Sequence, residues 1–98
     1  MAKIVLLEEV LGDMKHSRDW YDEQEQGLGE LFVERITECI EKIADNPKAY
    51  PVKYRILRAR LIQTFPYSVF YRVEKENEVH VYAVLHHRQN ANRILTAR

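Results

Sequence analysis

The chain has 98 residues, of which 46% are hydrophobic, so it can bury one core and is too short for two. Its 15 basic and 15 acidic side chains cancel, which argues against a nucleic-acid binder held by strong, uniform positive charge. This balance hides a split, because residues 1–50 carry 6 basic and 12 acidic side chains, whereas residues 51–98 carry 9 and 3. The halves therefore differ in sign, −6 against +6, which points to an anionic partner for the second half.

Cysteine usage and the N-terminal segment indicate the compartment. The one cysteine, Cys39, has no partner for an internal disulfide or a thiolate metal site, which fits a reducing environment. The apolar run at residues 4–7 is far shorter than the core of a signal peptide, and Glu8 and Glu9 follow it directly. We therefore expect a cytoplasmic protein that does not insert into membranes.

Two helices are predicted to follow a short N-terminal strand. The run KIVLL at residues 3–7 is typical of a buried strand. Apolar side chains then recur at helical spacing to about Gln26, and Gly27 can adopt the left-handed conformation of a helix end. A second helix begins near Leu28 and ends before Pro47, which cannot continue the hydrogen-bond ladder. So short a connection makes the two helices an antiparallel hairpin.

Three strands are predicted in the second half, at residues 54–62, 65–74 and 78–87. The polar turn Lys75-Glu76-Asn77 joins the last two as a hairpin. The order strand, two helices, three strands predicts a single α+β domain over residues 1–98. In this β-α-α-β-β-β arrangement, the helical hairpin packs on one face of a mainly antiparallel sheet, since this buries both apolar surfaces.

Side chains alternate along a strand, so each of the three runs divides into two faces. The odd-numbered positions are mostly apolar and are predicted to face the helices: Leu57, Ala59, Leu61, Phe65, Tyr67, Val69, Tyr71, Val73, Val79, Val81, Ala83 and Leu85. The even-numbered positions form a second face: Arg58, Arg60, Ser68, Phe70, Arg72, His80, Tyr82, His86 and Arg88. This basic, aromatic face suits a phosphate backbone or an acidic peptide. The same pattern also fits an ordinary sheet face turned toward water.

Other kinds of site find little support in the sequence. It has no glycine-rich phosphate loop, no serine-nucleophile motif and no metal-binding helix motif. His86 and His87 are adjacent in a strand and point to opposite faces, so they cannot chelate one ion together. Cys39 lies on the apolar stripe of the second helix and is predicted to pack in the core. We expect no cofactor and no metal.

Four stretches together resemble the RelE/ParE superfamily, the toxins of type II toxin-antitoxin modules. They are WYDEQEQGLGELF at residues 20–32, DNPKAYP at 45–51, FPYSVFYRV at 65–73 and VYAVLHHRQN at 81–90. Each is weak alone, but their order and spacing cover nearly the whole chain. The resemblance implies a compact toxin fold and a cognate antitoxin whose extended C-terminal segment wraps the toxin in a hetero-oligomer.

The resemblance leaves the target open between two branches. RelE-like members cleave mRNA in the ribosomal A site, which needs a base, an acid and cations around the phosphate. Arg58 and Arg60 match the basic second strand of that branch, and Arg88 matches its C-terminal arginine. Ser68 stands where an arginine should follow Tyr67, however, and no tyrosine occurs after Tyr82. If the chain is a nuclease, its candidate catalytic residues are Arg58, Arg60, Arg72, His86 and Arg88, with His86 as base or acid.

The FYRV and VLHHR stretches look more like the ParE branch, whose members poison DNA gyrase and are not known as nucleases. The expectation is therefore a non-enzymatic growth inhibitor of the plasmid-stabilization type, which binds gyrase and is neutralised by an antitoxin. The alternatives are a ribosome-dependent mRNA endonuclease or a degenerate, non-toxic family member. The predicted target- or antitoxin-binding face comprises Arg58, Arg60, Phe70, Arg72, Tyr82, His86 and Arg88.

Overall fold

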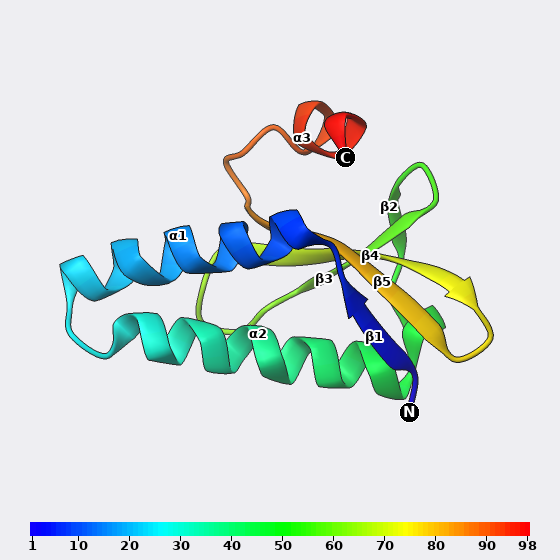
Figure 1. Ribbon diagram of the computed structural model, residues 1–98, viewed down its shortest axis with the longest axis horizontal. Coiled ribbons are helices and arrows are strands. Elements are labelled where there is room, and N and C mark those ends of the chain that lie inside the picture. Colours follow the sequence, from blue (N-terminus) through cyan, green and yellow to red (C-terminus); the bar gives the residue numbers. More distant parts are fainter.

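The chain begins with a short strand and a helical hairpin, followed by the rest of the sheet (Figure 1). The computed structural model describes residues 1–98. Its elements are β1 (Lys3–Leu6), α1 (Glu8–Gln24), α2 (Leu28–Asp45), the 3-10 helix η1 (Pro47–Ala49), β2 (Val52–Tyr54), β3 (Leu57–Leu61), β4 (Tyr67–Lys75), β5 (Glu78–His86) and α3 (Ala91–Ala97). The predicted α+β order is confirmed, with β2 and α3 as additions.

The helical hairpin forms where the sequence predicts it. Gly27 joins the two helices with a φ of 89°, the left-handed conformation that glycine adopts without steric cost. Helix α2 ends at Asp45, directly before the Asn46-Pro47 pair. Neither helix, nor α3, is long and apolar enough to cross a membrane.

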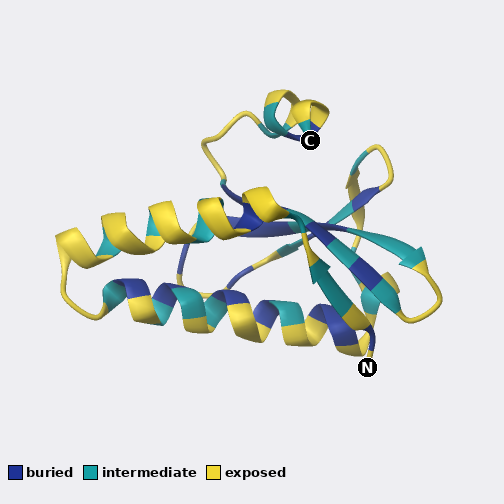
Figure 2. Cartoon of the chain, in the orientation of Figure 1, coloured by how far each residue is buried: buried dark blue, intermediate teal, exposed yellow.

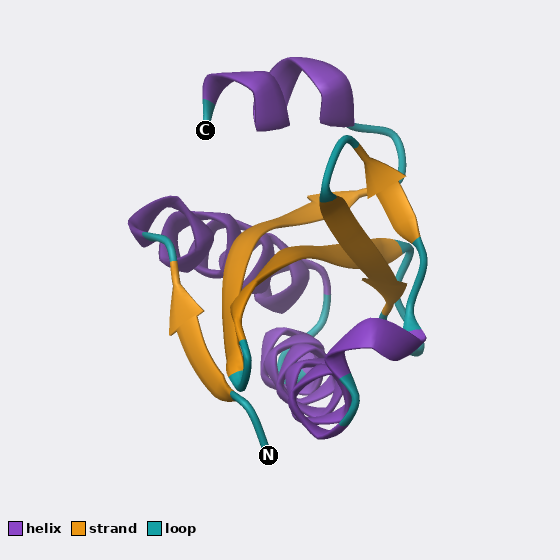
Figure 3. Cartoon of the chain, turned by 90° about the vertical axis from the view of Figure 1, so that its right-hand side faces the viewer, coloured by secondary structure: helices purple, strands orange, loops and turns teal.

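The sheet has the strand order β1-β5-β4-β3-β2. Strand β1 runs parallel to β5, and the other neighbours are antiparallel. Helices α1 and α2 cover one face of the sheet, and α3 lies on the opposite side (Figure 3). Strands β1 and β2, at the two edges, are the shortest, with four and three residues.

The main core lies between the helical hairpin and the sheet (Figure 2). Phe32, Ile36 and Ile43 of α2 are completely buried there, and Cys39 of α2 is nearly so, as predicted. Burial raises the pKa of the Cys39 thiol. Tyr71 of β4 is also fully buried, and its hydroxyl donates a hydrogen bond to the carbonyl oxygen of Pro47.

A second, smaller core lies under α3, on the sheet face that was predicted to have no helix over it. Leu57, Ala83, Leu85 and Leu95 are buried together there. The helix begins at Asn90, whose side-chain oxygen accepts a hydrogen bond from the backbone N–H of Arg93, 3.1 Å away. The second face of the sheet is therefore partly covered rather than bare.

A β-bulge at Tyr82 changes the alternation of β5. Phe70 pairs with Ala83 and Tyr71 pairs with Val81, which leaves Tyr82 without a partner on β4. Directly opposed residues share a face, so Ala83 and Leu85 lie with Phe70 and Ser68 on the second face. The prediction that Ala83 and Leu85 face the helical hairpin is therefore wrong, because one extra residue inverts the pattern.

In strand β3, too, the side chains face the opposite way from the prediction. Arg58 opposes Tyr71, and Arg60 opposes Val69, both of which are fully buried beneath the helical hairpin. The two arginines thus share the helix-covered face, while Leu57, Ala59 and Leu61 belong to the second face. Leu61, predicted to be in the core, is 61% exposed. The predicted alternation of side chains in β3 was correct, but alternation alone does not determine which set faces the helices.

Candidate functional site

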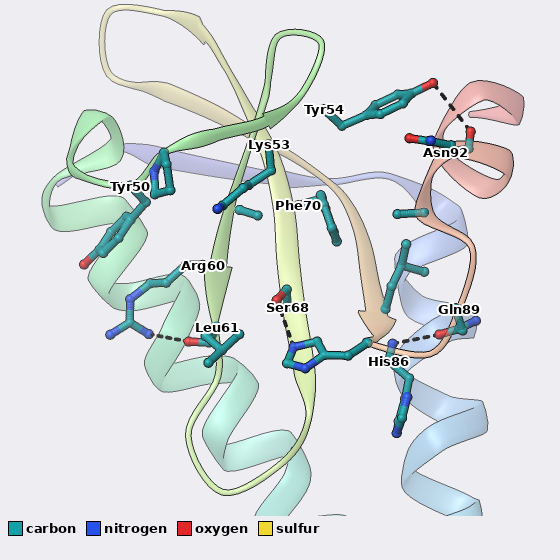
Figure 4. Close-up of a pocket in the computed structure, with 15 residues that line it drawn as sticks. Tyr50, Lys53, Tyr54, Arg60, Leu61, Ser68, Phe70, His86, Gln89 and Asn92 are labelled. Atoms are coloured by element: carbon teal, nitrogen blue, oxygen red, sulfur yellow. Dashed lines mark hydrogen bonds between the residues drawn. The ribbon is translucent and has the colours of Figure 1, made fainter.

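A groove of about 730 Å³ lies on the second face of the sheet, between β2 and the start of α3 (Figure 4). Ala59, Phe70 and Leu85 give it an apolar lining. Tyr54 stands at the α3 end, where its hydroxyl bonds the hydroxyl of Thr96 and lies 3.5 Å from the carbonyl oxygen of Asn92. Leu61 lines the groove while remaining largely exposed, so the groove offers apolar surface to a partner.

The polar groups of the groove are basic or neutral. Its basic side chains are Lys53 and Arg60, its lining also includes His86 and His87, and none of the 15 lining residues is acidic. The acidic side chains of the first half lie mainly on α1 and α2, which pack on the other face. An apolar groove with a basic rim suits a ligand that carries both apolar groups and carboxylates or phosphates.

Arg60 belongs to the helix-covered face of β3, but it also lines one end of the groove, where it has no acidic partner. Its guanidinium carbon lies 5.1 Å from the centre of the Tyr50 ring, in a cation–π arrangement. One guanidinium nitrogen donates a 3.3 Å hydrogen bond to the Leu61 carbonyl oxygen, and the buried Nε has no partner. The guanidinium is therefore held in place, and its terminal N–H groups that make no hydrogen bond are left as donors for an incoming acceptor.

The two adjacent histidines serve different faces, as predicted. The Nε2 of His87 lies 3.2 Å from the hydroxyl oxygen of Ser68, inside the groove. His86 instead opposes Tyr67 on the helix side, with the two ring centres 5.0 Å apart in an edge-to-face contact. The predicted placement of His86 on the second face is wrong because the bulge at Tyr82 lies between it and the start of β5.

His86 has a structural task at the end of β5. Its Nδ1 accepts a 3.0 Å hydrogen bond from the backbone N–H of Arg88, so the ring proton resides on Nε2 when the ring is neutral. Its own backbone N–H donates to the side-chain oxygen of Gln89 at 2.8 Å. These bonds fix the turn that leads from β5 to α3.

The other predicted site residues lie in different places. The guanidinium of Arg58 donates to the carbonyl oxygens of Tyr50, at 2.6 Å, and Lys48, at 3.3 Å. Arg72 does lie on the second face, opposite His80, but its Nε lies 3.4 Å from a carboxylate oxygen of Glu74. Arg88 is exposed in the turn after β5. The four arginines and one histidine proposed for a nuclease therefore do not share one face.

Phe70 and Tyr82 are on the second face as predicted. Phe70 lines the groove, and Tyr82 packs against the small core beneath α3. Sequence reasoning missed Lys53, Tyr54 and His87 as lining residues, since it placed no strand at β2 and no helix after β5. The signal available for α3 was Asn90 as a cap before Ala91, Ile94 and Leu95, which recur at helical spacing.

Comparisons with known proteins agree with this architecture. The family model described as "ParE toxin of type II toxin-antitoxin system, parDE" matches residues 4–91. A solved structure titled "Chromosomal ParDE TA system from P. aeruginosa" superposes with a TM-score of 0.63 and 14% identity, covering 86% of this chain and 94% of that one. At this identity the likeness shows a shared fold. A comparison with curated proteins returned no match. Because the family model spans β1 to the start of α3, the chain belongs to the ParE toxin family of type II toxin-antitoxin systems.

Proposed function

We propose that this chain inhibits growth by binding DNA gyrase and that a cognate antitoxin neutralises it. The ParE family match over residues 4–91 is the observation that carries the proposal. The P. aeruginosa structure, by its title, comes from a ParDE system, and the same pairing with an antitoxin is proposed here. The proposed mode of action is binding rather than bond cleavage, in the cytoplasm.

We place the antitoxin segment in the groove of the second face. The exposed Leu61, with Phe70, supplies apolar contact, while Arg60 and Lys53 supply positive charge without a competing carboxylate in the lining. An extended segment with alternating acidic and apolar side chains matches these features. The predicted binding face is thus kept for Arg60 and Phe70 and extended to Lys53 and His87.

The arrangement of cations supports binding over RNA cleavage. A 2′-hydroxyl attack needs a base and cations that converge on one phosphate. Arg58 is bonded to backbone carbonyl oxygens, and Arg72 lies against Glu74. The Nδ1 of His86 accepts a hydrogen bond from the backbone N–H of Arg88 in the turn after β5. These engagements disfavour the ribosome-dependent endonuclease, which remains the alternative to be tested.

The deciding experiment measures supercoiling of relaxed plasmid by purified gyrase as toxin is added. Loss of supercoiling, restored by the antitoxin encoded beside the toxin, is expected. Primer extension on mRNA from translating ribosomes is run in parallel. Intact supercoiling together with new 5′ ends in mRNA would replace the gyrase proposal with the endonuclease. Intact supercoiling without growth arrest would favour a degenerate, non-toxic member.

A further inference from the structure

The turn between β2 and β3 is built from residues that tight turns disfavour. Tyr54 pairs with Leu57, so Arg55 and Ile56 form a two-residue hairpin loop. Arg55 has a φ of 51°, a left-handed conformation that glycine or asparagine normally supplies in such loops. Ile56 is β-branched and 59% exposed. Neither side chain stabilises the turn, so a role in contacting another molecule accounts better for the presence of both residues.

This turn stands between two hollows of the surface. Arg55, Ile56 and Arg72 line both of them. The larger hollow, of about 580 Å³, extends to Val52, Lys48 and the end of the β4–β5 hairpin. The smaller, of about 230 Å³, extends to Tyr82 and α3. The Arg55-Ile56 turn is therefore a ridge that a partner can contact on both sides.

Positive charge surrounds the ridge. The larger hollow contains five basic side chains, Lys48, Arg55, Arg58, Arg72 and Lys75, and two acidic ones, Glu74 and Glu76, so its formal charge is 5 − 2 = +3. Only Arg72 among the five forms a salt bridge, with Glu74. The guanidinium carbon of Arg55 lies 5.4 Å from the centre of the Tyr54 ring, which orients it without neutralising it.

The apolar side chains distinguish a protein partner from a nucleic acid. Ile56 and Val52, 59% and 50% exposed, gain nothing from a phosphate backbone, and Glu74 and Glu76 repel one. A protein surface with carboxylates around an apolar recess would satisfy the arginines and bury Ile56 together. Complementary charge and apolar area therefore favour an acidic protein surface.

We infer that the Arg55-Ile56 ridge docks on an acidic surface of the protein that the toxin inhibits, with Ile56 entering an apolar recess. The identity of that protein as gyrase rests on the proposed function. The ridge and the groove share only Tyr54 among their lining residues. Target and antitoxin surfaces can thus be changed separately by mutation.

The test uses full-length toxin and purified gyrase in a direct binding assay, with thermal unfolding of each variant. Arg55→Gly and Ile56→Ser are each expected to lower gyrase affinity about tenfold or more. Arg55→Gly should leave the melting temperature unchanged or higher, because glycine relieves the left-handed conformation. Asn77→Gly is the matched control, since Asn77 also has a positive φ, 70°, in the β4–β5 turn. It should bind like the wild type.

The outcomes separate this inference from the proposed target. If the wild type binds gyrase and both ridge variants bind it equally well, the inferred role of the ridge is overturned. If the wild type itself does not bind gyrase, the proposed target fails, and growth arrest becomes the readout for the ridge. Loss of arrest in both stable variants then supports the ridge, and retained arrest overturns it. Binding of a short DNA duplex that both variants lose would also overturn it, as a phosphate site.

Discussion

The guanidinium of Arg98 binds both carboxylate oxygens of Asp13, each at 2.7 Å, across 85 residues of sequence. The same carboxylate accepts a 3.1 Å hydrogen bond from the backbone N–H of Val84, and Arg98 donates to the Tyr82 carbonyl oxygen at 3.0 Å. The hydrogen bond to Asp13 raises the pKa of Arg98. The pair therefore ties α1, the bulged part of β5 and the end of α3 together.

Asp13→Asn is expected to lower the free energy of unfolding by about 2–4 kcal/mol, because it leaves a poorly solvated guanidinium without its counter-charge. The side chains of Arg98 and Asp13 are 14% and 15% exposed. Urea unfolding measures the change. Arg18→Ala is the control, since its pair with Asp19 is 44% and 53% exposed and should contribute less than about 1 kcal/mol. Equal stabilities for the two variants would contradict a structural role for the Asp13–Arg98 pair.

Two helical glycines are expected to respond to alanine in opposite directions. A Cβ on Gly29 would lie 2.4 Å from the backbone carbonyl oxygen of Arg18, which cannot move as freely as a side chain. Gly29→Ala should therefore lower the free energy of unfolding by about 1–3 kcal/mol. A Cβ on Gly12 meets nothing within 4 Å, so Gly12→Ala should raise it by about 0.5–1 kcal/mol. Denaturant unfolding of both variants gives the two signs, and a shared sign would refute the close helix contact at Gly29.

Alkaline pH should destabilise the fold through two tyrosines. Burial raises the pKa of Tyr71 from 10.0 to about 12, and burial with the neighbouring Tyr67 raises that of Tyr21 equally. Between these values the folded state keeps protons that the unfolded chain has lost, so stability is complete below the unfolded pKa and falls as pH rises toward 12.

Tyr71→Phe removes one of these two contributions. Its urea midpoint should therefore fall less steeply than that of the wild type from about pH 10 to about pH 12. At neutral pH the variant should be less stable by about 1 kcal/mol, because the Pro47 carbonyl oxygen loses its donor. Identical alkaline slopes for variant and wild type would show that Tyr71 ionises as easily folded as unfolded.

Antitoxin binding should depend on an exposed leucine in the groove. Leu61→Ser should weaken binding of the antitoxin about tenfold or more, because a partner buries this side chain. Folding stability should change by less than about 0.5 kcal/mol, since Leu61 is already 61% exposed. Leu11→Ser on α1 is the matched control, as Leu11 is 58% exposed and lies outside the groove. Calorimetric titration measures both affinities, and equal losses would remove the groove from the interface.

The helices were predictable because their signals are local. The apolar stripe of α2, Gly27 and Pro47 each act through neighbouring residues, so the helical hairpin follows from the sequence alone. Helix α3 has seven residues and too few apolar positions for a period to emerge without its cap. Strand β2 has only three residues, and it forms because it pairs with β3.

The assignment of side chains to faces was not predictable to the same extent. Alternation gives two sets in each strand, but the choice of set for the core depends on strand pairing. In β3 the two arginines are only half-buried on the helix-covered face, and their guanidinium groups donate to backbone carbonyl oxygens, a position that tolerates long polar side chains. In β5 the bulge at Tyr82 has no signal in residue type, so His86 and His87 exchanged their expected sides.

The bulge at Tyr82 also bears on how such toxins diverge. Deleting the extra residue there would restore a regular ladder and leave His86 opposite Tyr67, whereas pairing Tyr82 in a regular ladder without a deletion would turn His86 to the groove side of the sheet and His87 away from it. Loss of the bulge at unchanged strand length can thus exchange the chemical lining of a binding surface as a whole, whereas point substitutions would have to replace each residue in turn. Aligned relatives should therefore be compared with a gap permitted at this position before the same role is given to their histidines.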